Sequence, residues 1–96
     1  MQVIWTPEAE TTFNLNIAYL QQEWNDKVIE RFIDKTDNLI TLISEQPLLC
    51  PLAHKKKSIR KCLVVKQVSL YYRVQKDAVY LITFWNNYQH PSKLKL

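Results

Sequence analysis

The chain has 96 residues, of which 47% are hydrophobic and 23% are charged, and its formal net charge is +4. This length supports one domain around one hydrophobic core, and the composition is that of a soluble globular protein. The sequence contains no glycine, which excludes the glycine-rich phosphate loops of ATPases, kinases and dinucleotide-binding enzymes. No apolar run reaches the roughly 18 residues of a membrane-spanning helix, and the N-terminus lacks the features of a signal peptide. We therefore expect a single domain, residues 1–96, that works in the cytoplasm without binding a membrane.

The sequence begins with a predicted strand and a predicted helix. Residues 2–5 are a short apolar run that is typical of a strand. Thr6 suits a helix N-cap, Pro7 suits the first helical position, and two glutamates follow near the positive end of the helix dipole. An apolar stripe at helical spacing then indicates the buried side of this helix: Phe13, Ile17, Leu20 and Trp24.

A second helix is predicted directly after the first. Asn25 or Asp26 is the expected N-cap, and the helix is expected to end before Pro47, because a residue that precedes proline is biased away from the helical conformation. The apolar face of this helix consists of Val28, Ile29, Phe32, Ile33, Leu39, Ile40 and Ile43. Two such helices joined by a tight turn predict a helical hairpin.

The pattern changes in the second half of the chain. Residues 47–58 form the only linker-like stretch, with two prolines and three consecutive lysines. From residue 59 onward the apolar residues follow a period of two, and residues 75–78 predict a turn between two strands. The predicted fold class is α+β, with an N-terminal strand, a helical hairpin and then a three-strand antiparallel meander, in the order βααβββ. Both helices are expected to pack on one face of this sheet.

The chain has two cysteines, Cys50 and Cys62, and no metal-ligand pattern surrounds them. We therefore expect no metal site. Because thiols in the cytoplasm are kept reduced, two free thiols are the expected state. A structural disulfide is the alternative.

The charges are unevenly distributed along the chain. Residues 1–53 hold three basic and eight acidic side chains, a net charge of −5. Residues 54–96 hold ten basic side chains and the single acid Asp77, a net charge of +9. Such a basic half should attract a polyanion, either nucleic acid or an acidic protein segment. Pairing of these cations with the acidic helices, or simple solvation, is the alternative.

Three strings of the sequence are informative together: "VIWTPEAE" at residues 3–10, "SIRKCLVV" at residues 58–65 and "LYYRVQKDAVYLITFWNNYQHPSKL" at residues 70–94. These strings resemble the RelE/ParE superfamily of toxins from type II toxin–antitoxin systems. Together they extend over nearly the whole chain. The last string is similar to the ParE-like branch, whose members are called plasmid stabilisation proteins and tend to end in "FWDNRQDPEKL".

The resemblance implies a small bacterial toxin that inhibits growth until its cognate antitoxin binds it. In this superfamily the ParE branch poisons DNA gyrase, whereas the RelE branch cleaves mRNA inside the ribosome. The ParE-like ending favours a toxin that acts by binding gyrase. The alternatives are a ribosome-dependent mRNA endoribonuclease, and a decayed toxin that serves only as an antitoxin-binding module. No cofactor is expected in any of these cases.

Four residues are candidates for catalysis if the chain is a nuclease of the RelE kind. Metal-free RNA cleavage needs a base for the 2′-hydroxyl proton, an acid for the leaving oxygen and cations for the charged phosphorane. His90 is the best acid or base, Tyr88 could stack on a nucleobase, and Arg60 and Arg73 could hold the phosphate. The alternatives are a solvated His90, a Tyr88 that only covers the sheet edge and an Arg73 in a buried ion pair. In the family ending, an acidic residue stands at the position of His90 and an arginine at that of Tyr88.

Five basic residues are candidates for binding nucleic acid or another target: Lys55, Lys56, Lys57, Arg60 and Lys61. A run of lysines is also typical of a solvated surface. The predicted strands are apolar on both faces, whereas the two helices can cover only one. An acidic antitoxin segment that wraps over the second face would explain both this pattern and the basic charge. A homodimer surface is the competing explanation.

Overall fold

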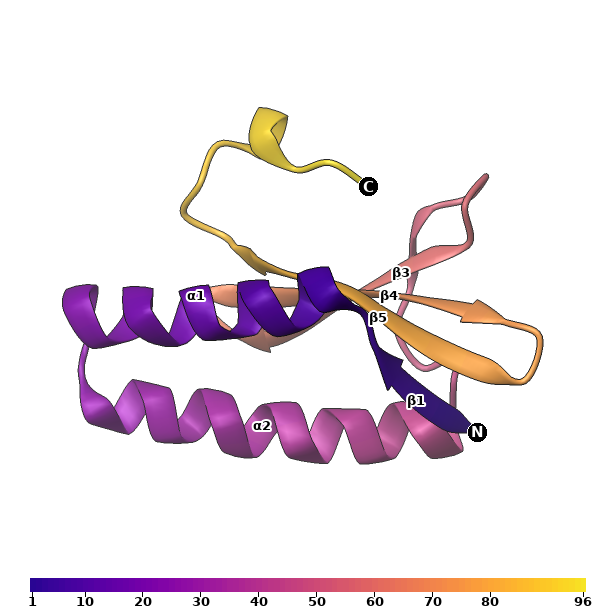
Figure 1. The fold of residues 1–96 in the computed structure, drawn as a ribbon, viewed down its shortest axis with the longest axis horizontal. Coiled ribbons are helices and arrows are strands. Elements are labelled where there is room, and N and C mark those ends of the chain that lie inside the picture. Colours follow the sequence, from indigo (N-terminus) through magenta and orange to yellow (C-terminus); the bar gives the residue numbers. More distant parts are fainter.

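The computed structural model describes residues 1–96, and its fold is drawn in Figure 1. The elements follow in the order β1 (Gln2–Trp5), α1 (Pro7–Glu23), α2 (Asp26–Glu45), β2 (Leu52–His54), β3 (Ile59–Val65), β4 (Val68–Gln75), β5 (Ala78–Asn86) and the 3₁₀ helix η1 (Pro91–Lys93). The five strands form one sheet in the order β1-β5-β4-β3-β2. No helix is both long and apolar enough to cross a membrane.

The sheet differs from the predicted three-strand antiparallel meander, and that prediction is wrong in two respects. A fourth strand, β2, follows the helices inside the predicted linker and pairs antiparallel with β3, so that Leu52 lies opposite Arg60. In addition, β1 joins the sheet parallel to β5, with Val3 opposite Val79. The sheet therefore has five strands and is mixed. A three-residue strand is too short to show alternation, and the pairing of β1 with β5 joins residues far apart in the sequence.

Both helices begin where the sequence predicts their caps. The Thr6 side chain accepts a hydrogen bond from the Ala9 main-chain nitrogen at 3.1 Å, and Asn25 accepts one from the Val28 nitrogen at 3.1 Å. These side chains satisfy main-chain N–H groups that have no partner within the helix. α2 ends at Glu45, two residues before the proline that was expected to stop it.

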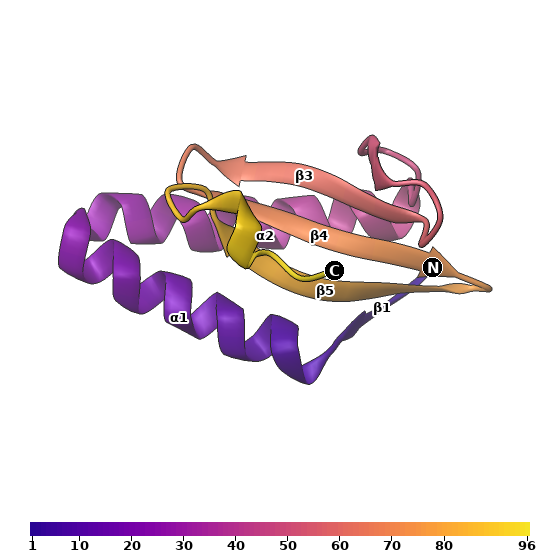
Figure 2. The same cartoon turned by 90° about the horizontal axis from the view of Figure 1, so that it is seen from above.

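The helical hairpin covers one face of the sheet, which we call the helix face. The buried core between the two layers contains Ala9, Leu20, Phe32, Ile43, Cys50, Cys62, Val64, Val65, Val68, Leu70, Tyr72, Val79, Leu81 and Phe84. At its centre Phe84 packs against Trp5, Phe13 and Phe32, with ring centroids 5.2 to 6.0 Å apart. In Figures 1 and 2 the chain after β5 crosses the opposite side of the sheet from α2.

Helix α1 also protects the edge of β5 beyond the end of β1. The Thr6 hydroxyl donates a hydrogen bond to the Leu81 carbonyl at 2.7 Å. Further along, the Thr12 hydroxyl accepts from the Phe84 nitrogen at 2.9 Å, and the Asn16 amide donates to the Phe84 carbonyl at 3.0 Å. A free strand edge would otherwise expose unpaired main-chain groups. The polar side of α1 therefore fixes the end of β5, from which the C-terminal segment departs.

Candidate functional site

The face of the sheet turned away from the helices is the candidate binding surface, and we call it the open face. Strand register assigns its members, because directly opposed residues of antiparallel strands share a face. Opposed pairs are Ile59 with Arg73, Lys61 with Tyr71, and Leu63 with Ser69 across β3 and β4. β5 contributes Tyr80 opposite Arg73 and Trp85 opposite Ser69.

Residues 88–96, which we call the tail, partly cover the open face (Figure 2). Only Leu94 and Leu96 of this segment are half-buried, whereas its other residues are exposed. The Lys57 ammonium group donates a hydrogen bond to the Leu96 main-chain oxygen. The tail thus reaches from the end of β5 to the turn before β3.

Tyr71 and Lys61 lie side by side at the middle of the open face. The Lys61 ammonium nitrogen is 5.8 Å from the centroid of the Tyr71 ring, which is within cation–π range. Tyr71 is buried, whereas Lys61 is exposed. The pair therefore presents a positive charge above an aromatic surface, an arrangement suited to an anionic partner.

Arg73 lies on the same face and borders a cavity of about 410 Å³. This cavity is lined by Thr6, Glu8, Lys57, Ile59, Arg73, Ile82 and Leu96. The Nε atom of Arg73 is buried and has no hydrogen-bond partner. The sequence alone did not indicate this cavity, because it depends on the register that sets Ile59 opposite Arg73 and on the course of the tail.

The predicted lysine run forms the exposed turn between β2 and β3. Lys55, Lys56 and Lys57 are all exposed, and the His54 Nδ1 atom accepts a hydrogen bond from the Lys57 main-chain nitrogen at 3.3 Å. Ser58 closes the turn with φ of 55°, in the left-handed region. Of the three lysines, Lys57 lines the cavity at Arg73.

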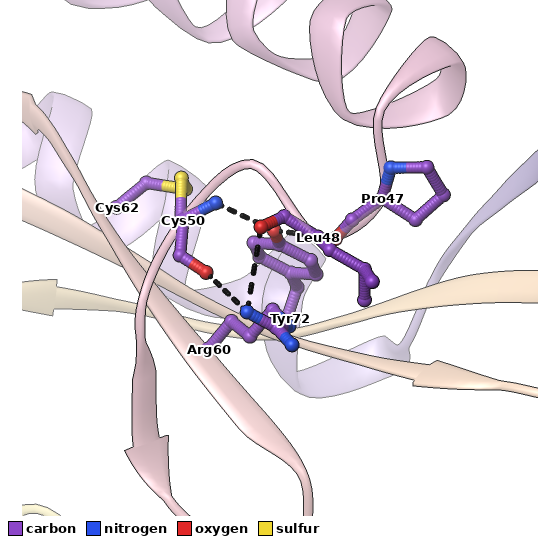
Figure 3. Close-up of a disulfide and its surroundings, with 6 residues drawn as sticks. All are labelled: Pro47, Leu48, Cys50, Arg60, Cys62 and Tyr72. Atoms are coloured by element: carbon purple, nitrogen blue, oxygen red, sulfur yellow. Dashed lines mark hydrogen bonds between the residues drawn. A yellow bond between two sulfur atoms is a disulfide. The ribbon is translucent and has the colours of Figure 1, made fainter.

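Arg60 lies on the helix face, on the other side of the sheet from Arg73. It is opposite Tyr72 in β4, and its Nη1 atom donates hydrogen bonds to the Cys50 carbonyl at 2.7 Å and the Leu48 carbonyl at 3.4 Å (Figure 3). Arg60 therefore fixes the segment between α2 and β2. The two arginines that were candidates for holding one phosphate do not converge.

Tyr72 and a disulfide complete this network around the α2–β2 segment. The Tyr72 hydroxyl donates to the Pro47 carbonyl at 2.7 Å and accepts from the Cys50 nitrogen at 3.3 Å (Figure 3). Burial raises the pKa of Tyr72, whereas the hydrogen bond from Cys50 and the positive charge of Arg60 act to lower it. Cys50 and Cys62 are joined in a disulfide, with their Cα atoms 5.5 Å apart, so the expectation of two free thiols is wrong.

Tyr88 and His90 lie near the far end of the sheet from Arg73. Tyr88 is 52% exposed, and its ring centroid is 6.0 Å from that of Trp24 at the end of α1. The His90 Nδ1 atom accepts from the Ser92 main-chain nitrogen at 3.1 Å, which caps η1. β5 runs from Tyr80, opposite Arg73, to Asn86 next to this segment, a distance of about 20 Å at strand spacing. The four candidate catalytic residues therefore occupy three separate regions.

A family model described as "ParE toxin of type II toxin-antitoxin system, parDE" matches residues 3–89. The chain belongs to this family. The match extends from β1 through the end of β5 and includes Arg60, Arg73 and Tyr88, whereas His90 and the residues after it lie beyond the match. None of the curated proteins compared with this ParE-family chain matches it.

Solved toxin structures share the fold of this ParE-family chain. The YoeB/ParE toxin from Agrobacterium tumefaciens has a TM-score of 0.64 and 18% identity, covering 92% of this chain and 100% of that one. For the chromosomal ParDE system from P. aeruginosa the TM-score is 0.63 and the identity 9%, covering 90% of this chain and 95% of that one. For the YoeB-YefM complex from Staphylococcus aureus the TM-score is 0.59 and the identity 15%, covering 92% of this chain and 98% of that one. At these identities the likeness shows the fold alone.

Proposed function

We propose that this chain is the toxin of a type II toxin–antitoxin module and arrests growth by binding DNA gyrase in the cytoplasm. Membership of the ParE toxin family supports the first part of the proposal. The ParE-like ending of the sequence supports gyrase as the target. In this proposal the toxin occludes or traps gyrase by binding to it, and the toxin itself carries out no chemical step.

The separation of the nuclease candidates is the observation that carries the choice of a binding toxin. An acid, a base and the phosphate-holding cations must lie within hydrogen-bond reach of one substrate. Arg60 is engaged by main-chain carbonyls on the helix face, whereas Arg73 lies on the open face. Tyr88 and His90 follow the Asn86 end of β5. That end lies about 20 Å along the strand from Tyr80, which is opposite Arg73. This arrangement supports binding over RNA cleavage.

The proposed antitoxin is an acidic protein segment that lies on the open face and the basic half of the chain. The net charge of +9 in residues 54–96 supports an acidic partner. Lys61 and Arg73 on the open face, with Lys55, Lys56 and Lys57 at its margin, would contact that segment. Two of the structural relatives, ParDE from P. aeruginosa and YoeB-YefM from Staphylococcus aureus, are toxin–antitoxin systems by name. A toxin homodimer is the competing cover for the same face.

The deciding experiment follows thymidine and amino-acid incorporation together, shortly after the toxin is induced without antitoxin. The expected result is that DNA synthesis stops first and that the purified toxin inhibits supercoiling by gyrase. If protein synthesis stops first, the ribosomal nuclease is the function. If neither process changes, the chain is only an antitoxin-binding module.

A matched pair of variants sharpens this test. Tyr88→Ala combined with His90→Ala removes both candidate groups, the stacking ring and the imidazole, from exposed positions, so the fold should be kept. A gyrase-binding toxin should retain growth arrest in this double variant, whereas a nuclease that depends on these groups should lose it. Ser92→Ala, which alters the same turn without removing a candidate group, is the control.

A further inference from the structure

The guanidinium group of Arg73 has an unmet hydrogen-bonding capacity in a protected position. Its Nε atom is buried without a partner, although almost all buried polar atoms in proteins are hydrogen-bonded. Arginine is always charged and presents its N–H groups as a fork that fits a carboxylate or a phosphate. Arg73 also lines a cavity, from which an acceptor can approach its guanidinium group, so the missing partner of Nε points to an acceptor that binds there.

The charges around the cavity favour an anion. Lys57 and Arg73 both line it, and Glu8 is the one acidic side chain among its lining residues. The Lys57 ammonium group already holds an oxygen acceptor there, the main-chain oxygen of Leu96. Lys57 and Arg73 thus border the same cavity. The ammonium group of Lys57 is hydrogen-bonded to the tail, whereas the Nε atom of Arg73 has no acceptor.

We propose that this cavity is a carboxylate-binding site that receives an aspartate or glutamate side chain from an acidic protein segment. The carboxylate accepts from the Arg73 fork and replaces the Leu96 oxygen as the partner of Lys57. The last residues of the tail therefore move aside when the site is filled. The identity of the ligand as part of a protein partner rests on the proposed function, whereas the anion site itself does not.

The lining of the cavity favours a carboxylate over a nucleic-acid phosphate. Ile59 and Ile82 line the cavity with apolar side chains, and both stay in place when the tail moves aside. Apolar walls of this kind suit a single carboxylate that belongs to a protein segment with apolar neighbouring side chains. A phosphodiester chain would instead bring several charges past these apolar walls and past Glu8. Backbone phosphates are normally followed by a track of cations on the protein surface.

The test uses the three arginines of the chain, Arg31, Arg60 and Arg73, which give three side-chain Nε–H signals in an NMR spectrum of the purified protein. Acetate and inorganic phosphate are titrated separately at pH 7 and constant ionic strength. The expected result is a saturable shift of the Arg73 signal with acetate, in the millimolar range, while Arg31 and Arg60 serve as internal references. Glutamate within a blocked tripeptide of apolar neighbours should bind more tightly than acetate.

Two variants connect the signal to the site. Arg73→Lys keeps the charge but loses the fork, so acetate binding should weaken about tenfold. It is followed through the main-chain amide signals of Ile59 and Ile82. Lys57→Gln changes an exposed side chain that the fold does not need, and it should weaken binding severalfold. Arg31→Lys on the far surface of α2 should leave the titration unchanged.

Two outcomes overturn the proposal. A saturable response to phosphate without one to acetate would assign the site to nucleic acid. Equal, linear movement of all three arginine signals would mean that no anion site exists. Neither outcome bears on growth arrest, since the titration needs no target. A toxin that stops DNA synthesis but fails this titration would keep the proposed function and lose only the carboxylate site.

Discussion

The two faces of the sheet are built from the same strands but are closed in different ways. The helix face is closed by two helices, a set of contacting aromatic rings, the disulfide and the hydrogen bonds of Arg60 and Tyr72. The open face is closed only by the tail, in which the two half-buried side chains are Leu94 and Leu96. Most of the stability therefore resides on the helix face, whereas the proposed binding belongs to the open face. A thinly covered face can exchange its cover for a partner without unfolding the domain.

The largest effect should come from opening the aromatic core of the helix face. Phe84 is 2% exposed and contacts three aromatic rings, so Phe84→Ala should lower the free energy of unfolding by about 3–5 kcal/mol. Leu63→Ala is the control on the open face, where Leu63 is 67% exposed, and it should cost less than about 0.5 kcal/mol. Urea unfolding measures both. Similar losses in the two variants would contradict the division between the faces.

Breaking the disulfide should produce the next largest loss. Cys50 and Cys62 are 12 residues apart, and closing a loop of this length stabilises the folded state by about 3 kcal/mol through the entropy of the unfolded chain. Urea unfolding with and without dithiothreitol measures this term. The double variant Cys50→Ala with Cys62→Ala is the control, and its stability should not respond to the reductant. An unchanged midpoint for the reduced wild-type chain would mean that hydrogen bonds alone hold the segment.

A smaller loss should follow from removing one hydroxyl of the helix-face network. Tyr72→Phe leaves the Pro47 carbonyl and the buried Cys50 nitrogen without their partner, which should cost about 1–3 kcal/mol. Tyr71→Phe makes the same change at the preceding residue, whose side chain lies on the opposite face, and should cost less than about 0.5 kcal/mol. Equal costs at the two positions in urea unfolding would show that the hydroxyl of Tyr72 has no special role.

The same hydroxyl predicts how stability depends on alkaline pH. Burial raises the pKa of Tyr72 above its ordinary value of 10.0, against the opposing effects of the Cys50 hydrogen bond and the Arg60 charge. The folded state therefore holds this proton more tightly than the unfolded state. Its contribution to stability is complete below pH 10 and is lost as the pH rises through the folded pKa. Urea unfolding from pH 8 to 11.5 should show this decline in the wild-type chain and a shallower one in Tyr72→Phe.

Local signals in the sequence predict the helices but not the pairing of the strands. The caps at Thr6 and Asn25 were predictable because each depends on residues three positions apart. β2 was missed because two prolines and a lysine run surround a strand of only three residues. The parallel pairing of β1 with β5 was missed because it joins residues about 76 positions apart, for which no local pattern exists. The disulfide was missed because cytoplasmic thiols are expected to be reduced, whereas the 5.5 Å approach of the two Cα atoms comes only from the fold.

The site shows the same limit at the level of single side chains. Arg60 and Arg73 were both candidates for one phosphate, because the guanidinium group of arginine can hold a phosphate through two hydrogen bonds. Which face each occupies depends on register, which sets Ile59 rather than Arg60 opposite Arg73. A shift of one residue in register would exchange the two faces for a whole strand. The sequence therefore identifies which side chains could bind a phosphate, but it does not show whether they lie close enough together to bind the same one.

The smallest effect on stability should come from the charge at the centre of the open face. Lys61 is exposed, and its cation–π contact with Tyr71, at 5.8 Å, should contribute at most about 0.5 kcal/mol. Lys61→Gln should therefore leave urea unfolding almost unchanged, and the control Lys66→Gln, at another exposed lysine, should behave alike. A loss above about 1 kcal/mol at Lys61 alone would mean that the open face contributes to folding as the helix face does. The tail would then be part of the core, and a partner could not replace it without partly unfolding the sheet.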